Sequence, residues 1–229
     1  MNNKKAVIIG ATGLVGKALV KKCLDSELFG EVVILVRRNS GIKHPKLREH
    51  VIDFNDFTEY KTHISGDVLF SCMGTTLKQA GSKKSQYKVD FTYQYQAAVA
   101  GKKNNIPTYV LVSSTGADSS SRFFYLRMKG ELEDAVKKLE FNSTIILQPS
   151  LLTGDREKNR TGERIGATLY KTVIKIIPKL KKYKPIAGEE VAEAMIIAAK
   201  NAQKGTVVLK SQQISASIGH SKSSNYDTR

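Results

Sequence analysis

The chain of 229 residues, 41% of them hydrophobic, has the length and composition of a single α/β domain with a substantial core. Its apolar runs fall short of the ~20 residues of a membrane helix, so we expect no membrane span. Lysine and arginine outnumber aspartate and glutamate by 37 to 21, and the net charge of +16 points to nucleic acid, an acidic surface or a phosphorylated ligand, or simply to solubility.

The cysteines and histidines argue against a disulfide framework and a metal site. The chain has only Cys23 and Cys72, and its four histidines form no ligand-spaced cluster with them. The start, MNNKKAVIIG, places lysines before an apolar stretch as a signal peptide does, but the stretch breaks at Gly10 and predicts a first strand. We therefore predict a cytoplasmic protein without a signal peptide or a bound metal.

The strongest motif lies near the amino terminus, where an apolar run leads into glycines and then into helical spacing. Residues 6–9 predict a buried strand and residues 14–24 a helix. Glycines three apart between them let the backbone approach a pyrophosphate at the amino end of that helix, although a tight turn without a ligand is the alternative. The residues predicted to bind a dinucleotide here are Gly10, Thr12, Gly13, Leu14, Val15 and Gly16.

The end of the second predicted strand, residues 31–36, indicates which dinucleotide binds. An acidic residue there would bond the ribose hydroxyls of NAD, whereas this strand ends in Arg37 and Arg38, and no acid occurs between Glu31 and Glu49. Arginine suits a 2′-phosphate, so we predict NADP(H) as the cofactor. The alternative is a solvated strand end.

Two further strand ends extend the predicted site. Strand 49–52 ends in Asp53 and Phe54, which we expect to meet the adenine, unless Asp53 caps the following helical turn. Strand 67–72 ends in CMGTT, which is placed to line a crevice at the point where the strand order reverses. The residues expected to contact the cofactor there are Cys72, Gly74, Thr75 and Thr76.

A serine, a tyrosine and a lysine in the middle of the chain suggest proton-transfer chemistry. After a polar loop (77–86), a helix (87–103) and a strand (109–112), Ser114 follows the strand end. In the next helix, 121–139, Tyr125 and Lys129 are four residues apart and share a face. A lysine ammonium lowers the pKa of a neighbouring tyrosine toward the working range, while the serine hydroxyl holds a carbonyl. An ordinary surface pair is the alternative.

The rest of the chain predicts a strand (143–148), a polar lid (154–162), helices (163–177 and 189–201) and a last strand (205–210). Ten lysines and arginines lie between Arg156 and Lys184, opposed by two glutamates. An anionic substrate, an acidic partner or solvent could use this basic segment, and nucleic acid is the least favoured because no binding motif accompanies it. Residues 213–229 have the composition of a flexible tail.

The segments GATGLVG, LVRR, CMGTT, VSSTGAD, YLRMKGELE and LQPSLLTGDR resemble the short-chain dehydrogenase/reductase superfamily. Within it, they resemble the atypical, epimerase/dehydratase-related branch of the Tat-interacting oxidoreductase-like proteins. The resemblance implies one NAD(P)-binding Rossmann domain over residues 1–212, with a doubly wound, mostly parallel sheet and a small substrate-side lobe at 151–185. Many relatives carry an asparagine in the helix before the serine strand, where this chain carries Asp90.

The resemblance also implies site roles. Ser114, Tyr125 and Lys129 would form the catalytic set, and Lys129 would also bind the nicotinamide ribose. The segment that would lie against the nicotinamide contains Pro149, Leu151 and Leu152. We therefore predict an NADPH-dependent oxidoreductase that transfers a hydride to or from a small carbonyl or alcohol substrate, with Tyr125 as acid/base. The alternative is a non-catalytic NADP(H)-binding regulator or redox sensor that acts through a protein partner.

Overall fold

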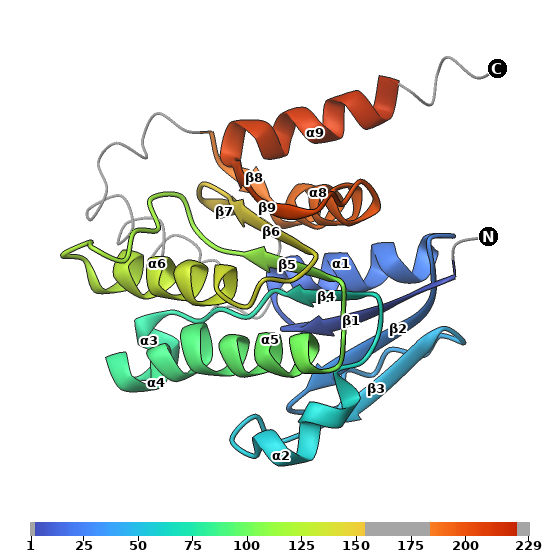
Figure 1. Ribbon diagram of the computed structural model, residues 1–229, viewed down its shortest axis with the longest axis horizontal. Helices are drawn as coiled ribbons and strands as arrows, with labels where there is room; N and C mark the ends of the chain where they lie inside the picture. The colour runs from blue at the N-terminus through green and yellow to red at the C-terminus, as the bar shows by residue number, and fades with distance from the viewer. Residues whose placement is uncertain (1–2, 154–183, 224–229) are drawn as a thin grey trace.

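The apolar runs of the sequence form one seven-stranded parallel sheet in the computed structural model, which describes residues 3–153 and 184–223 (Figure 1). The strand order is β3-β2-β1-β4-β5-β6-β9. The inner strands are buried and need no polar alternation, which explains their apolar runs, whereas the edge strands β3 and β9 carry exposed residues. The strands are β1 (Lys4–Ile9), β2 (Phe29–Val36), β3 (Leu47–Val51), β4 (Val68–Ser71), β5 (Thr108–Val112), β6 (Ser143–Gln148) and β9 (Gly205–Lys210).

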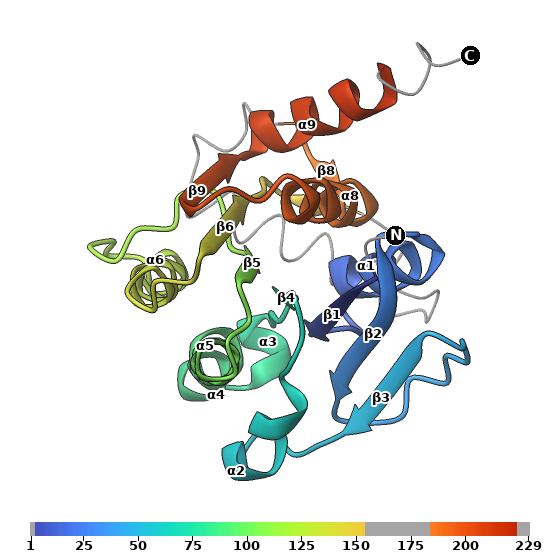
Figure 2. The same cartoon turned by 45° about the vertical axis from the view of Figure 1, so that its right-hand side comes forward.

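Helices cover both faces of the sheet and create two hydrophobic cores (Figure 2). On one face, α1 (Leu14–Asp25), α8 (Gly188–Lys200) and α9 (Ser211–Ser223) share a core with the sheet. On the other face, α5 (Tyr93–Lys103) and α6 (Phe124–Lys137) pack against the second core. This arrangement confirms the predicted doubly wound fold.

The strand order reverses beside β1, which lies between β2 and β4. The connections that follow β1 and β4 therefore leave the sheet in opposite directions, and a crevice opens at the carboxyl ends of these strands. Gly10 and Cys72 mark the two sides of this crevice, directly after β1 and β4.

Short helices occupy the segment 77–86, which we predicted as a loop. They are α3 (Leu77–Ala80) and α4 (Lys83–Tyr87), and each begins with a hydroxyl cap. Thr76 Oγ1 accepts a hydrogen bond from the Gln79 amide at 3.1 Å, and Ser82 Oγ accepts one from the Ser85 amide at 3.0 Å. The predicted long helix consequently starts earlier than residue 87.

This long helix also contains a π-helical turn, η2 (Lys88–Thr92), between α4 and α5. Three aromatic side chains four residues apart share one face of this helix: Phe91 stacks on Tyr87 and on Tyr95, with centroid separations of 4.8 and 5.8 Å. Earlier in the chain, two short helices connect β3 to β4. They are α2 (Phe57–Tyr60) and the 3₁₀-helix η1 (Lys61–His63).

The carboxyl-terminal segment differs from the predicted flexible tail, because its first part is the helix α9. Ile214 and Ile218 lie four residues apart on this helix and are 0% and 7% exposed. Both belong to the core that α1 and α8 share. Two isoleucines on one helical face therefore outweigh the small polar composition of the segment.

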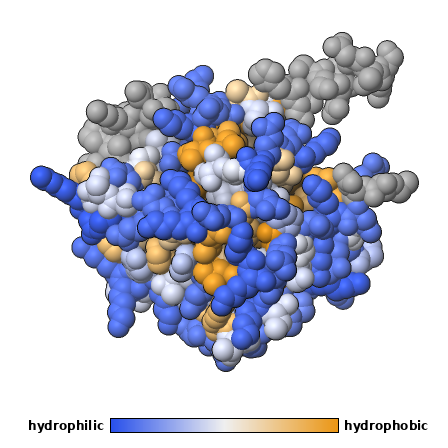
Figure 3. Space-filling model, in the orientation of Figure 1, coloured by the Kyte–Doolittle hydropathy of each residue, from blue (hydrophilic) through white to orange (hydrophobic). Residues whose placement is uncertain are grey.

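A second, two-stranded parallel sheet pairs β7 (Leu152–Thr153) with β8 (Ile186–Ala187). The predicted lid, the predicted helix 163–177 and nearly all of the basic segment fall between these strands and lie outside the described residues. Within the described ranges, no helix has the length and apolar character needed to cross a membrane. The surface in Figure 3 is largely hydrophilic, with hydrophobic patches near its centre.

Candidate active site

The glycine turn between β1 and α1 is closed so tightly that side chains would not fit. Gly10 has a φ of +77°, and a Cβ atom there would lie 2.5 Å from the Cys72 carbonyl carbon. A Cβ atom on Gly16 would lie 2.1 Å from the Gly10 oxygen. The amide of Gly13 donates to that same oxygen at 3.0 Å, which holds the turn closed.

The helix that follows this turn offers its amino end to a ligand. Gly13 is the N-cap of α1 and supplies no side-chain cap, and the first turn contains no acidic residue. The positive end of the helix dipole is therefore left for an anion, as a pyrophosphate site requires. The residues present fit a dinucleotide.

A cavity of about 1170 Å³ opens in front of this turn. It is lined by the glycine turn, the end of β2, the segment after β4, and the amino end of α8. Of the residues predicted to bind the cofactor, its lining includes Gly10, Thr12, Gly13, Leu14, Arg37, Phe54, Cys72, Gly74 and Thr75. Half of the predicted cofactor contacts thus meet in one cavity.

Several predicted contacts lie elsewhere among the described residues. Val15 and Gly16 are buried in α1, and Arg38 is exposed outside the described lining. Asp53 Oδ1 accepts hydrogen bonds from the amide and side chain of Asn55 at 2.9 and 2.7 Å, which is a local turn. The side chain of Thr76 caps α3. Of the two arginines, Arg37 therefore lines the cavity and Arg38 does not. Of the pair after β3, Phe54 lines the cavity and Asp53 does not.

Cys72 is a packing residue in this geometry. Its Sγ lies 3.9 Å from Met195 Sδ, and burial raises the pKa of its thiol, so that the reactive thiolate is disfavoured. The other cysteine, Cys23, is fully buried in the core of α1, and burial raises the pKa of its thiol as well. Both cysteines are free thiols.

Ser114, Tyr125 and Lys129 come together at the carboxyl end of β5 and the start of α6. Burial raises the pKa of Tyr125, the Lys129 ammonium lowers it, the Asp90 carboxylate raises it, and a hydrogen bond with the Ser114 side chain lowers it. The net pKa lies above the ordinary tyrosine value. All three predicted catalytic residues therefore interact, with Asp90 as a fourth member.

Lys129 and Asp90 form a buried ion pair. Lys129 Nζ lies 3.0 Å from Asp90 Oδ1, and the two side chains are 3% and 1% exposed. Burial alone would lower the pKa of Lys129, but Asp90 and Tyr125 outweigh it, and the pKa is raised. The lysine therefore stays charged.

The Asp90 carboxylate also connects this cluster to the cavity wall. Its second oxygen accepts a hydrogen bond from the Thr75 amide at 2.8 Å. Gln94 Nε2 donates to the Asp90 carbonyl at 2.7 Å, which holds the π-helical turn. Among the described residues, the cavity lining includes Thr75 but not Ser114, Tyr125 or Lys129, so the cluster of these three residues meets the cavity wall through Asp90 and Thr75.

The segment after β6 adjoins the same region. The Thr115 amide donates to the Pro149 carbonyl at 3.0 Å, and Ser150 Oγ donates to the Lys184 carbonyl at 2.7 Å. Leu151 and Leu152 follow as half-buried residues, and Thr153 lines the cavity. The segment therefore runs from the serine strand end to the cavity.

Sequence reasoning did not single out three charged residues of the site. Lys17 and Lys21 project from α1 into the cavity lining, and their spacing of four could have revealed this. Glu133 lies one turn after Lys129 and is 4% exposed. Its carboxylate accepts hydrogen bonds from Ser113 Oγ and, at 3.0 Å, from Gln148 Nε2. Only the packing of β5 and β6 against α6 reveals that role.

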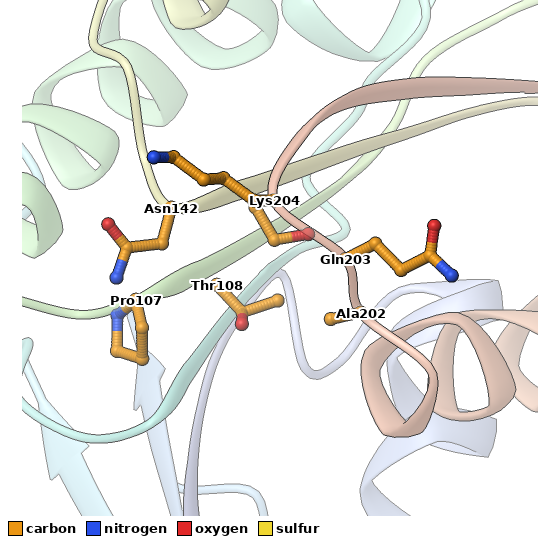
Figure 4. A pocket seen from close by; sticks show the side chains of 7 residues that line it. Pro107, Thr108, Asn142, Ala202, Gln203 and Lys204 are labelled. Atoms are coloured by element: carbon orange, nitrogen blue, oxygen red, sulfur yellow. The ribbon is translucent and has the colours of Figure 1, made fainter.

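A second cavity, of about 380 Å³, lies at the opposite end of the sheet (Figure 4). It opens at the amino ends of β5, β6 and β9, and its lining residues are Pro107, Thr108, Asn142, Ser143, Ala202, Gln203 and Lys204. Because the crevice of the glycine turn lies at the carboxyl ends of the strands, the two cavities are separate.

Comparison with known proteins places this site in a family. The sequence profile of a family described as NAD(P)H-binding matches residues 10–202. The chain belongs to this NAD(P)H-binding family. The family match covers the glycine turn, the arginine strand end and the Ser114–Tyr125–Lys129 cluster, and it leaves NAD and NADP undistinguished.

Relatives confirm the branch to which the motifs pointed. Protein FMP52, mitochondrial, from Candida glabrata is 36% identical over 216 residues, which is 90% of each chain. Protein HTATIP2 from Rattus norvegicus is 37% identical over 174 residues, 74% of this chain and 72% of the relative.

Solved structures show the same fold at low identity. A UDP-N-acetylglucosamine 4-epimerase from Methanobrevibacter ruminantium M1 matches with a TM-score of 0.67 and 17% identity over 91% of this chain and 77% of the other. A short chain dehydrogenase family protein from Francisella tularensis matches with a TM-score of 0.65 and 15% identity, over 92% and 98%.

The relatives correct one prediction. We expected a cytoplasmic protein from the low cysteine content and the absence of a signal-like start, but relatives over 90% of the chain are named as mitochondrial proteins. The prediction of a cytoplasmic location is therefore wrong. A low cysteine content does not distinguish among compartments that keep thiols reduced.

Proposed function

We propose that this chain is an NADPH-dependent oxidoreductase of the short-chain type, which acts on a small carbonyl or alcohol substrate. The observation that carries the proposal is the buried Lys129, held within electrostatic reach of Tyr125, which itself bonds Ser114. A tyrosine, a lysine and a serine so arranged can transfer a proton and orient a carbonyl oxygen. Membership of an NAD(P)H-binding family supplies the redox partner.

The roles follow from the chemistry of each side chain. When bound, the dinucleotide supplies or accepts a hydride at the substrate carbon. Tyr125 exchanges a proton with the substrate oxygen, and the Ser114 hydroxyl donates a hydrogen bond to that oxygen. The Lys129 ammonium provides a fixed positive charge that stabilises the phenolate form of Tyr125.

NADPH is proposed over NADH because of the charges around the cavity. Arg37 lines it at the end of β2, and Lys17 and Lys21 line it from α1. A 2′-phosphate adds negative charge to the ribose, and arginine binds phosphate with two parallel hydrogen bonds. The described lining also holds Glu189, at the amino end of α8.

The experiment that tests this proposal has two stages. Titration with NADPH and with NADH, followed by nicotinamide fluorescence, should give tighter binding of NADPH, and Arg37→Ala should remove the preference. A panel of carbonyl substrates is then screened by NADPH consumption, with Tyr125→Phe as the inactive control. If neither nucleotide binds, both parts of the proposal fail.

A second candidate is an NADP(H)-binding regulator that acts through a protein partner. It is favoured by one observation: among the described residues, Ser114, Tyr125 and Lys129 do not line the cavity. The two candidates differ in turnover, since the regulator binds NADPH but consumes none in the carbonyl screen.

We also propose a mitochondrial location, in view of the names of the relatives. Fractionation of cells that express the tagged chain, with and without protease treatment of intact mitochondria, tests it.

A further inference from the structure

In the substrate-free protein, the positive charge of Lys129 is already paired with the carboxylate of Asp90. Its Nζ atom lies 3.0 Å from a carboxylate oxygen of Asp90, and both side chains are almost completely buried. An ammonium stabilises a neighbouring phenolate only to the extent that its field is not cancelled by an anion nearby. In this chain, Asp90 lies close enough to oppose Lys129 directly, and its charge acts on Tyr125 as well.

A second carboxylate acts on the same lysine. Glu133 lies one helical turn beyond Lys129 and is 4% exposed. Its nearest cation, Lys137, is 3.9 Å away and has a 38% exposed side chain, so solvent weakens that pair. Two buried carboxylates therefore surround one buried ammonium.

Few other described groups act on Tyr125. From its own helix the charged group is Lys129, from η2 it is Asp90, and from the end of β5 it is the neutral hydroxyl of Ser114. The remaining acid of this part of α6, Glu131, bonds Tyr87 at 3.1 Å and pairs with Arg127 at 3.8 Å. It belongs to another face of the helix, where it is about one-third exposed.

We propose that Asp90 is a positioning residue whose ion pair with Lys129 helps to keep the proton on Tyr125 at neutral pH, the state from which a carbonyl is reduced. The inference rests on the proposed oxidoreductase function and adds the protonation state in which Tyr125 works. A protonated Tyr125 donates to a carbonyl oxygen, whereas alcohol oxidation needs the phenolate. Burial is the largest cause of the raised pKa of Tyr125, and the Asp90 carboxylate raises that pKa further by opposing Lys129.

The reductive step balances with the groups named. The carbonyl carbon accepts a hydride from the reduced dinucleotide, and the carbonyl π electrons move to the oxygen. That oxygen takes the proton of Tyr125, which becomes a phenolate and recovers a proton from solvent. The substrate is reduced to an alcohol, and the dinucleotide is oxidised.

The decisive variant is Asp90→Asn, which removes the negative charge with little change of shape. An amide oxygen can still accept the hydrogen bond from the Thr75 amide. The phenolate of Tyr125 then faces a Lys129 that has lost its ion-pair partner and is opposed only by the more distant Glu133, so the ionisation midpoint of Tyr125 should fall by about one pH unit or more. The tyrosine Cζ chemical shift in an isotope-labelled sample reports this midpoint without any substrate, and Tyr125→Phe identifies the signal.

Glu131→Gln is the matched control, because it removes an acid of the same helix that pairs with Arg127 and not with Lys129. It should leave the midpoint of Tyr125 unchanged. An unchanged midpoint in Asp90→Asn, with the variant folded by circular dichroism, would overturn the proposal. If that variant does not fold, the wild type decides alone: a Tyr125 midpoint near neutral pH contradicts the inference.

Turnover provides a second readout. With any substrate found in the carbonyl screen, wild-type reduction should persist from neutral into alkaline pH, and in Asp90→Asn the pH at which reduction falls should shift downward. A Tyr125 that titrates as expected in a protein without turnover would leave the charge assignment standing and defeat the proposed function. If the protein turns over substrate but the ionisation midpoint of Tyr125 is the same in Asp90→Asn as in the wild type, the proposed function stands and the role of Asp90 is refuted.

Discussion

At the carboxyl ends of β1 and β2, the candidate site consists mainly of backbone, namely the glycine turn and the uncapped start of α1. Beyond β4 it consists of side chains, namely the buried pair of Lys129 and Asp90 with the half-buried Ser114 and Tyr125 beside it. We call these the nucleotide half and the proton half. A backbone site requires that side chains be absent, whereas a buried charged site requires that each charge have its partner. Substitutions should therefore damage the two halves in different ways.

The largest effect is expected in the proton half. Lys129→Met leaves the Asp90 carboxylate buried without its cation and should lower the free energy of unfolding by about 3–5 kcal/mol at neutral pH. Adding Asp90→Leu should recover much of that loss, because the second change removes the orphaned charge. Urea denaturation measures both. If Lys129→Met is as stable as the wild type, the Lys129–Asp90 ion pair does not behave as a buried ion pair, and the contrast between the two halves of the site fails.

The next effect lies in the nucleotide half and is steric. Gly10→Ala would place a methyl group against the backbone of residues 72 and 73, and should cost about 1–3 kcal/mol in stability together with nucleotide binding. Gly41→Ala is the matched control, since Gly41 also has a positive φ but its added Cβ meets nothing within 4 Å. That control should cost only about 1 kcal/mol and keep NADPH affinity. Equal losses in both variants would assign the effect to backbone strain alone.

Arg37 tests whether a side chain contributes to the nucleotide half. Arg37→Ala should weaken NADPH binding about tenfold, or ~1.4 kcal/mol, and leave NADH binding nearly unchanged. Arg38→Ala should change neither NADPH nor NADH affinity much, because Arg38 is exposed and is not among the described residues that line the cavity. Nicotinamide fluorescence gives all four affinities, and a larger loss from Arg38→Ala would reverse the assignment.

The smallest effect sharpens the contrast between buried and exposed charge. Lys22 of α1 pairs with Glu193 of α8 at 3.1 Å, and both side chains are about one-third exposed. Glu193→Gln should reduce stability by less than about 1 kcal/mol, and by still less at high salt. Thermal unfolding at two salt concentrations measures this. A loss comparable to that of Lys129→Met would show that exposure does not distinguish the two pairs.

The nucleotide half could be predicted from the sequence, because a strand, a glycine turn and a helix start are each encoded by neighbouring residues. The strands Ser143–Gln148 and Gly205–Lys210, the first buried and the second at the sheet edge, were predicted at their observed bounds, since apolar runs between turn residues are readable directly. The glycine spacing could likewise be interpreted without knowing the fold.

The proton half was only partly predictable. Tyr125 and Lys129 share one helix, but Asp90 reaches Lys129 from another helix, through a π-helical turn that the spacing did not reveal. Helix α9 was missed because two isoleucines among serines give a weak periodic signal, and packing against α8 decides the outcome.

The pairing of β7 with β8 has a consequence for how the chain can change over evolution. These strands run parallel, and a parallel pair needs a connection of about a dozen residues or more to return the chain to the same end. The connection, residues 154–185, therefore has a minimum length but no matching maximum. Insertions at this point should be tolerated while the sheet and the glycine turn keep their length, and deletions should be tolerated until about a dozen residues remain.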